Sequence, residues 1–446
     1  MSSQTTKKII SLVAGAAALA GLAGAGIAGT HTANAEPQQY KAPLFGFGSD
    51  TTQDVVNALG GFANGKTYTP LVTSEATGYK QLVNFDATIP GEADATKREC
   101  IATKLGSPLI LRPNGSGEGQ KVLSRQAGGV WYTGLTVTAA ITAASCNSSR
   151  NIAGLVDFAR SSSSVSNAVG TDITALPFGV DALTFAYSKP KTSSDSVCGT
   201  GAEACHDAVD TLTKAELTTL YTNGVLVKNN TVIVPCGIQT SSGTYKTWYG
   251  KTGNTSSQEG IGTAFCNGIG NGSRLQENHG PELKAKADAL LTTTNAICDG
   301  VAGDPAVSCK DVQVVVGFAA SAWVSKSNGL SSPAPGTGVS LGLAGGKTFV
   351  TYTAGNAVGS KWSPNTDGFN DTNWNRNVYN MVLSANLDNS TGDAAIIEMF
   401  KGSTSLMCGS AAQAIVNSFG FLSLGNDAST GCGNSTTKGG LVANNG

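Results

Sequence analysis

The chain has 446 residues, with 29 Lys and Arg against 30 Asp and Glu, and 57 glycines. The balanced charge and the lack of a basic face argue against nucleic acid as a partner. The length exceeds what one ordinary core holds, so two lobes are expected.

The N-terminus has the pattern of a targeting segment. Lys7 and Lys8 precede an apolar stretch from 9 to 29, and Ala33-Asn34-Ala35 has the small-x-small pattern of a cleavage site. We expect a signal peptide over residues 1–35 and an exported protein, secreted or held in the cell envelope. No cysteine directly follows the apolar stretch, so we expect no lipid attachment.

Four small-residue loops follow along the chain. They are loop 1 (47–52, FGSDTT), loop 2 (112–121, RPNGSGEGQK), loop 3 (157–163, DFARSSS) and loop 4 (240–246, TSSGTYK). Helices are plausible after loops 1 and 4. Small residues let a ligand approach the backbone, and the first turn of a helix offers free N–H donors to anions. The candidate ligand residues are Ser49, Asp50, Thr51, Ser116, Arg160, Ser161, Ser162, Ser242, Gly243 and Thr244.

Each loop also has a simpler interpretation. A Gly-Ser turn is usually only a turn, and Asp50 with Gln53 equally fits a helix N-cap box.

Apolar runs of strand length alternate with helical patterns, which predicts an α/β fold. SPLILRP (107–113) and LVDFARS (155–161) are predicted to be buried parallel strands, and TVIVPCGIQ (231–239) leads into loop 4. Thr213 and Glu216 form a capping box for a helix through Tyr221. A second helix is predicted over 281–297, with QENHG (276–280) as its polar opening.

Ten cysteines in an exported chain indicate disulfides rather than a metal site. The connectivity stays open. Pairing of neighbours would give Cys100–Cys146, Cys198–Cys205, Cys236–Cys266, Cys298–Cys309 and Cys408–Cys432. No CxxC spacing suggests zinc, so we expect neither metal nor cofactor.

Two enzyme motifs fail on their context. GVSLG (338–342) matches the GxSxG elbow, but no histidine follows Ser340, which excludes the Ser…Asp…His order. GKT (346–348) lacks the first glycine of a phosphate-binding P-loop, because position 341 is leucine. We expect that His206 is an exposed residue and that the protein is not an enzyme.

The order of the loops resembles the phosphate-binding proteins of ABC transporters. In that family a GxGxTF-like loop, a GSG loop, a DFGxSD-like strand end and a GSGT loop follow in this order, similar to loops 1–4. PFGVDALTFAYSKP (177–190) resembles the strand that crosses between the lobes. The resemblance covers most of residues 44–425.

This resemblance implies an α/β, two-lobed type II periplasmic-binding-protein fold. Each lobe would hold a mixed, mainly parallel sheet flanked by helices, with hinge strands between. We expect lobe 1 at 36–182 and 366–446, and lobe 2 at 183–365. The implied function is binding of a small oxyanion, phosphate first, by a monomer that could serve an ABC-transporter permease.

Departures from the family pattern bear on the ligand. The family's carboxylate, which accepts the proton of hydrogen phosphate, falls on Ser162, and its arginine falls on Ile238. Arg160 and Asp50 are candidate replacements for the charge and the proton acceptor. The alternative is a secreted surface or interaction protein with the same fold and a degenerate pocket.

Overall fold

The structure is a computed structural model. It describes residues 43–72, 80–92, 99–103, 107–127, 130–131, 150–188, 209–228, 231–270, 272–291, 311–353, 362–425, 427 and 430–443. The expected signal peptide lies outside these ranges, as does His206.

The fold is mixed α/β and is built on one large mixed sheet with the strand order β12-β13-β14-β10-β19-β9-β1-β4, while β15 and β20 also pair with β10. These strands are β1 (Leu44–Gly48), β4 (Leu82–Asn84), β9 (Phe158–Ser161), β10 (Ile173–Ser188), β12 (Leu226–Lys228), β13 (Thr231–Pro235), β14 (Asp311–Ala319), β15 (Val339–Leu341), β19 (Asn375–Leu383) and β20 (Thr437–Gly439).

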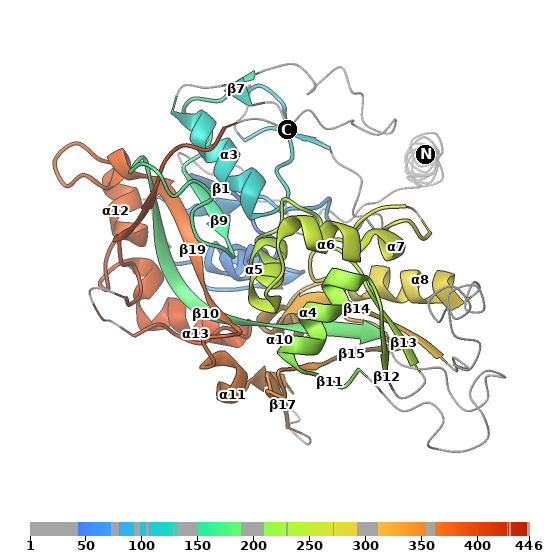
Figure 1. The fold of residues 1–446 in the computed structure, drawn as a ribbon. Helices are drawn as coiled ribbons and strands as arrows, with labels where there is room; N and C mark the ends of the chain where they lie inside the picture. Colours follow the sequence, from blue (N-terminus) through green and yellow to red (C-terminus); the bar gives the residue numbers. More distant parts are fainter. Residues whose placement is uncertain are drawn as a thin grey trace, which may run out of the picture.

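Strand β10 divides this sheet into two parts. Its residues 173–182 pair with β19, and 173–175 also pair with β20, whereas 183–188 pair with β14 and β15. We call β4, β1, β9, β19, β20 and 173–182 the first half-sheet, and 183–188, β14, β13, β12 and β15 the second half-sheet. Figure 1 shows β10 running from the side of β19 to the side of β13 and β14. The sequence prediction that 177–190 crosses the molecule agrees with this path.

The remaining strands form two-stranded pairs. They are β2 (Phe62–Ala63) with β3 (Lys66–Thr67), β5 (Cys100–Ile101) with β6 (Ile110–Leu111), β7 (Val130–Trp131) with β8 (Arg150–Asn151), β11 (Thr211–Leu212) with β16 (Leu343–Ala344), and β17 (Val350–Tyr352) with β18 (Trp362–Pro364).

Parallel pairing occurs in both half-sheets, between β1 and both of its neighbours β4 and β9, and between β13 and β14. The prediction of a parallel strand in LVDFARS is confirmed by β9. The prediction for SPLILRP is wrong, because only two of its residues pair there, as β6, and they pair antiparallel with β5. Ile110 and Leu111 are buried, whereas Leu109 is 39% exposed, so only the short β6 part of this apolar run is a buried strand.

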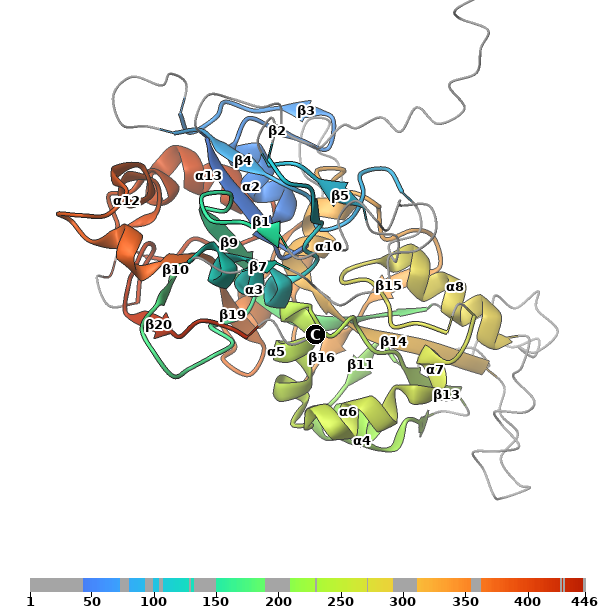
Figure 2. The same ribbon diagram turned by 90° about the horizontal axis from the view of Figure 1, so that it is seen from above.

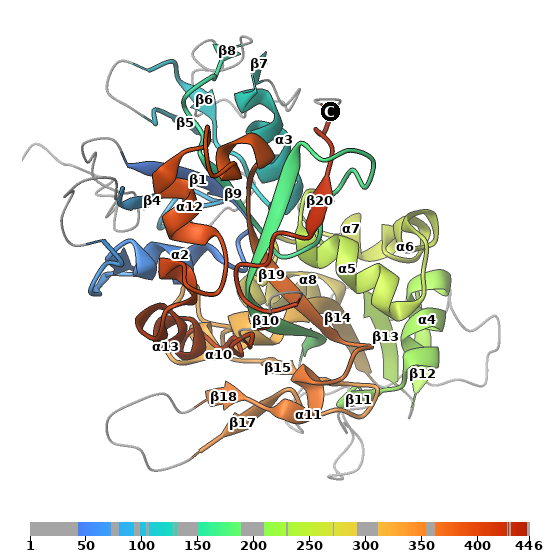
Figure 3. The same cartoon turned by 90° about the vertical axis from the view of Figure 1, so that its left-hand side faces the viewer.

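Helices cover the half-sheets. They are α2 (Gln53–Leu59), α3 (Ser116–Gln126), α4 (Lys214–Asn223), α5 (Gly243–Thr252), α6 (Ser256–Gly262), α7 (Ala264–Asn267), α8 (Gly280–Leu291), α10 (Ala320–Ser327), α11 (Thr366–Phe369), α12 (Ala394–Phe400) and α13 (Ser410–Ser418), with 3-10 turns η1 (Ser384–Leu387) and η2 (Leu406–Cys408). Figure 3 shows α12 and α13 on one side of β10 and β19, and α4, α5 and α6 on the other.

Local sequence signals explain where several helices begin. The predicted capping box is present: the Thr213 side chain accepts from Glu216 N, and the Glu216 side chain accepts from Thr213 N. The Ser242 side chain caps α5 by accepting from Tyr245 N at 3.1 Å. The predicted helix at 281–297 begins at Gly280 and is described to Leu291.

The first half-sheet is covered on both faces. Leu44 belongs to one apolar cluster with Ile396 of α12, and the next residue, Phe45, belongs to another with Val122 of α3. Because successive side chains of a strand point to opposite faces, β1 separates these two cores. The second half-sheet has its own core, which includes Trp248 and Phe318.

Two predicted disulfides are confirmed, Cys236–Cys266 and Cys408–Cys432, with Cα–Cα distances of 5.1 and 5.7 Å. Cys100 is also disulfide-bonded. Its predicted partner Cys146 and the predicted pairs Cys198–Cys205 and Cys298–Cys309 lie outside the described residues.

In the described part of the chain, no helix has the length and hydropathy needed to cross a membrane.

Candidate functional site

Loops 1, 2 and 4 meet through their backbones. Gly115 N donates to Gly48 O at 3.1 Å, and Gly117 N donates to Ser241 O at 2.8 Å. Gly48 and Gly115 have φ of +127° and +92°, which L side chains rarely adopt, so the glycines are needed for these turns. Loop 4 leads into α5, and Figure 2 shows α5 beside α3. The site therefore joins elements of both half-sheets.

Five buried hydroxyl residues converge where the loops meet. We call Ser49, Thr51, Ser116, Ser162 and Thr244 the hydroxyl cluster. Ser49 Oγ donates to Ser162 Oγ at 3.0 Å, and Ser116 Oγ lies 3.3 Å from Ser162 Oγ. Thr51 Oγ1 and Thr244 Oγ1 are 3.4 Å apart. Ser49, Thr51 and Ser162 follow strands of the first half-sheet, and Ser116 begins α3, which packs against it. Thr244 lies in α5, which follows β13 of the second half-sheet.

Gly243 fits this cluster only because it lacks a side chain. A Cβ atom at this position would lie 2.4 Å from Ser116 Oγ and 2.5 Å from Ser162 Oγ. These distances are well inside van der Waals contact. Loop 4 can therefore approach loops 2 and 3 this closely only with glycine here.

The centre of the cluster holds a carboxylate, that of Glu277. Its Oε1 atom accepts from Thr51 Oγ1 at 2.7 Å, from Thr244 N at 3.3 Å, from Ser162 Oγ at 3.4 Å and from Thr244 Oγ1. Glu277 is completely buried. Its other oxygen, Oε2, has no hydrogen-bond partner among the described residues. One anionic oxygen thus receives donors from both half-sheets.

The segment before α8 positions this carboxylate. Leu275 N donates to Gly237 O and Leu275 O accepts from Gln239 N, which ties the segment to the end of β13. Glu277 N donates to Gln239 Oε1 at 2.9 Å. Asn278 adopts a left-handed φ of +55° and donates to Thr51 Oγ1 at 3.0 Å. The expectation that 276–280 are merely the first turn of a helix is wrong, because α8 begins at Gly280.

A buried arginine supplies positive charge beside the cluster. Arg376 Nη2 donates to Thr244 Oγ1 at 2.9 Å and to Thr51 Oγ1 at 3.5 Å. Its Nε and Nη2 also donate to Asp181 Oδ2 at 2.9 and 2.8 Å. Asp181 Oδ1 accepts from Ser321 N at the start of α10. This ion pair links β10 with β19, where the two residues face each other in register.

Other candidates from the sequence have different partners. Arg160 Nε donates to Ser49 O at 3.1 Å and its Nη1 to Phe85 O at 2.9 Å, so the cation bonded directly to the cluster hydroxyls is Arg376 rather than Arg160. Ser161 Oγ donates to Ser163 O at 2.7 Å. Ser242 caps α5. The structure therefore brings six of the candidates together, the cluster and Gly243, and gives these three local roles.

Asp50 lies beside the cluster among other titratable groups. Burial raises the pKa of Asp50 from 3.8 to about 6; Lys326 opposes this shift, whereas Glu277 and Asp54 add to it. Burial also raises the pKa of Asp54, against the effect of Lys326. Burial and Lys326 lower the pKa of His279 to about 4, so this imidazole is neutral at pH 7. The alternative interpretation, in which Asp50 caps α2, is wrong. The N-cap residue of α2 is Thr52, and its side chain makes no capping hydrogen bond.

Replacing Asp50 by asparagine should stabilise the protein at neutral pH. Because its pKa is raised, folded Asp50 binds its proton more tightly than the unfolded chain does, so ionisation costs stability as pH rises from about 4 through 6. Asp50→Asn should therefore increase the free energy of unfolding by about 1–3 kcal/mol at pH 7.5 and by much less at pH 4. Urea denaturation at both pH values measures this, and an equal change at both would contradict it.

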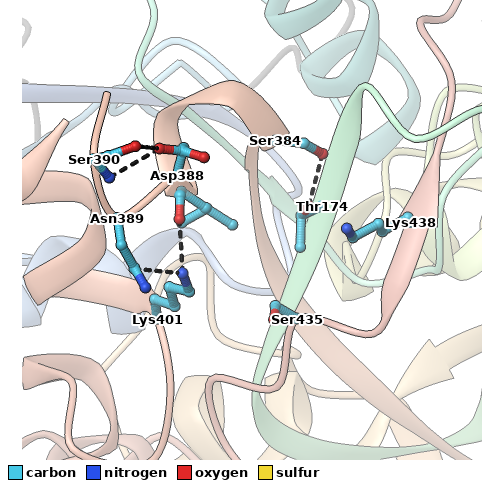
Figure 4. A pocket seen from close by; sticks show the side chains of 9 residues that line it. Thr174, Ser384, Asp388, Asn389, Ser390, Lys401, Ser435 and Lys438 are labelled. Atoms are coloured by element: carbon cyan, nitrogen blue, oxygen red, sulfur yellow. Dashed lines mark hydrogen bonds between the residues drawn. The ribbon is translucent and has the colours of Figure 1, made fainter. Parts of the chain in front are cut away.

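A cavity of about 470 Å³ lies elsewhere, between the ends of β10, η1, α12 and β20 (Figure 4). Its lining residues are Thr174, Ser384, Leu387, Asp388, Asn389, Ser390, Lys401, Ser435 and Lys438.

Most polar groups of this cavity already bond to one another. Thr174 and Ser384 share a hydrogen bond of 2.7 Å, and Lys401 Nζ donates to Leu387 O and Asn389 Oδ1 at 2.7 and 2.8 Å. The cavity shares no residue with the hydroxyl cluster. The hydroxyl cluster is the better candidate because donors from both half-sheets converge there on one carboxylate oxygen.

Glu277 and Arg376 were missed in the sequence. Neither stands in a motif, and only the fold brings them to the loops. The sequence around Asp181 does indicate a buried ion pair, because a carboxylate inside the apolar run PFGVDALTF requires a buried cationic partner. Among the described residues, no group of three or more His, Cys, Asp or Glu could hold a metal ion.

No protein-family model and no curated protein matches the chain. Among solved structures, it is similar to a candidate phosphate ABC transporter substrate-binding protein with bound phosphate from Clostridium perfringens, at 10% identity and a TM-score of 0.37, over 85% of this chain and 99% of that one. It is also similar to a possible phosphate binding protein from Planctomyces limnophilus, at 11% identity and a TM-score of 0.34, over 86% and 93% of the two chains. These values are too low to transfer a ligand or a role to this chain.

Proposed function

We propose that the protein is an exported solute-binding protein that encloses a small oxyanion in the hydroxyl cluster, with phosphate as the first candidate. The observation that carries this proposal is the convergence of donors from both half-sheets on a single anionic oxygen, that of Glu277. A site that is this well supplied with donors suits an oxyanion, which has several such oxygens.

Three features give the cluster its affinity for negative charge. The hydroxyls can turn to donate, and Thr244 N–H stands at the N-terminus of α5, where the helix dipole favours anions. Arg376 adds a formal positive charge, because its guanidinium group donates a hydrogen bond to Thr244 Oγ1. All of these groups are buried, so their interactions are weakly screened by water.

The nearby carboxylates favour a solute that carries a proton. A carboxylate beside an anion is repulsive unless the two share a proton. Hydrogen phosphate has such a proton at neutral pH and sulfate has none. With Asp50 beside the site, we expect phosphate and arsenate to bind more tightly than sulfate. Isothermal titration of the mature protein with these three anions tests the function.

Gly243→Ala should weaken phosphate binding at least tenfold. The added methyl group would overlap the hydroxyls of Ser116 and Ser162 and hold loop 4 away from loops 2 and 3. Gly250→Ala is the matched control, because it adds the same group to the same helix where no atom lies within 4 Å. Titration of both variants with phosphate decides, and equal affinities would show that phosphate does not bind among these loops.

The second candidate is a secreted surface or interaction protein whose anion site has become structural. The presence of Glu277 inside the cluster favours it, because the chain then satisfies its own donors. If this second function is correct, isothermal titration should show no heat of binding with any of the three anions. It makes no use of a transporter, whereas the leading proposal would deliver its solute to an ABC-transporter permease.

A further inference from the structure

We propose that Glu277 is a built-in ligand: its carboxylate takes the place of one oxygen of the solute, holds the two half-sheets together when no solute is bound, and must be displaced for solute to enter. Only the displacement of Glu277 by solute rests on the proposed function. The bridge that Glu277 makes between the half-sheets in the absence of solute does not depend on it.

Glu277 bonds across the boundary between the half-sheets. Its own backbone is tied to the second half-sheet through Gln239, which follows β13. Its Oε1 accepts from Thr51 and Ser162, which follow β1 and β9 of the first half-sheet. The carboxylate therefore makes the kind of bridge between loops that a bound oxyanion would make.

The bridge is also incomplete, which makes it replaceable. A buried carboxylate oxygen without a donor costs free energy, and Glu277 Oε2 is in this position among the described residues. One guanidinium nitrogen, Arg376 Nη1, likewise has no acceptor in the described part of the chain. A tetrahedral oxyanion has more oxygens than Glu277 presents, so it can satisfy more donors than the internal carboxylate does.

Glu277→Ala should therefore have two effects. Without the bridge, the half-sheets should separate more often in the absence of solute. Without the competing charge, phosphate should bind more tightly, by tenfold or more, because nothing has to be displaced. Both effects oppose what is expected of a residue that contacts the solute favourably.

Hydrogen exchange measured by mass spectrometry reports the first effect. The amide of Gly117 is a suitable reporter, because it donates to Ser241 O across the boundary rather than to Glu277. We expect the peptide that contains Gly117 to exchange at least tenfold faster in solute-free Glu277→Ala than in wild type. Peptides from β14 should be unchanged, which shows that the core remains folded. Glu398→Ala, an exposed carboxylate on α12, is the control and should match wild type.

Phosphate titration reports the second effect and separates the two proposals. Faster exchange at Gly117 with tighter phosphate binding supports both. Faster exchange with no phosphate binding by either protein supports the bridge and overturns the proposed function. Unchanged exchange at Gly117 overturns the bridge, and unchanged or weaker phosphate binding overturns the displacement. If Glu277→Ala does not fold, Glu277→Leu fills similar space without an acceptor oxygen and is judged by the same two measurements.

Discussion

Replacing Arg376 by methionine should lower the free energy of unfolding by about 3–5 kcal/mol. Methionine fills similar space but leaves the Asp181 carboxylate buried without its cation. Asp181 is completely buried and Arg376 is 8% exposed, so water cannot replace the lost partner. The Thr51 and Thr244 hydroxyls lose a donor in the same substitution. Urea denaturation at pH 7 measures the change.

The double variant Asp181→Leu with Arg376→Met is the control for this prediction. It removes both charges together, so no uncompensated ion remains, and much of the lost stability should return. Asp181 also accepts from Ser321 N, so recovery should be incomplete. A loss below about 1 kcal/mol in the single variant would show that the pair is not the buried charge network described here.

Replacing both cysteines of one bridge by serine should cost about 2–5 kcal/mol. The bridges Cys236–Cys266 and Cys408–Cys432 close segments separated by 30 and 24 residues. Because the two closed segments are similar in length, the two bridges remove similar amounts of chain entropy from the unfolded state. The two double variants should therefore lose comparable stability. Denaturation without reductant, compared with wild type, gives both values.

Denaturation with reductant is the control. Reductant should lower the free energy of unfolding of wild type towards the values of the variants, and it should lower that of each variant less. Mass spectrometry of the denatured, unreduced protein should also find no alkylatable thiol. Two or more labelled cysteines would contradict the expectation that export leaves every cysteine paired.

Much of the fold could be predicted because its signals are local. The capping box at Thr213 and Glu216 fixes the start of α4. The apolar run from 177 to 190 resembles the family's crossing strand, and its residues up to 188 belong to β10. SPLILRP shows where such signals fail: its apolar residues predict a buried strand, but they do not fix the direction in which it pairs, which is antiparallel to β5.

The candidate site was predictable in part for the same reason. Glycine and hydroxyl residues mark loops, so Ser49, Ser116, Ser162, Gly243 and Thr244 could be chosen before their contacts were known. Glu277 and Arg376 reach the same place from positions 33 and 132 residues beyond Thr244. Contacts of this separation leave no local pattern. They follow from how β19 and the segment before α8 pack against the half-sheets.

The sharing of β10 also ties the stability of the two half-sheets together. Residues 173–182 and 183–188 form one continuous strand, so disruption of either half-sheet removes the structure that aligns the other's part of this strand. Because each half-sheet contains part of β10, we expect the two halves to unfold together rather than as isolated units. The molecule gains cooperativity from this arrangement: the free energy of one core also protects the other.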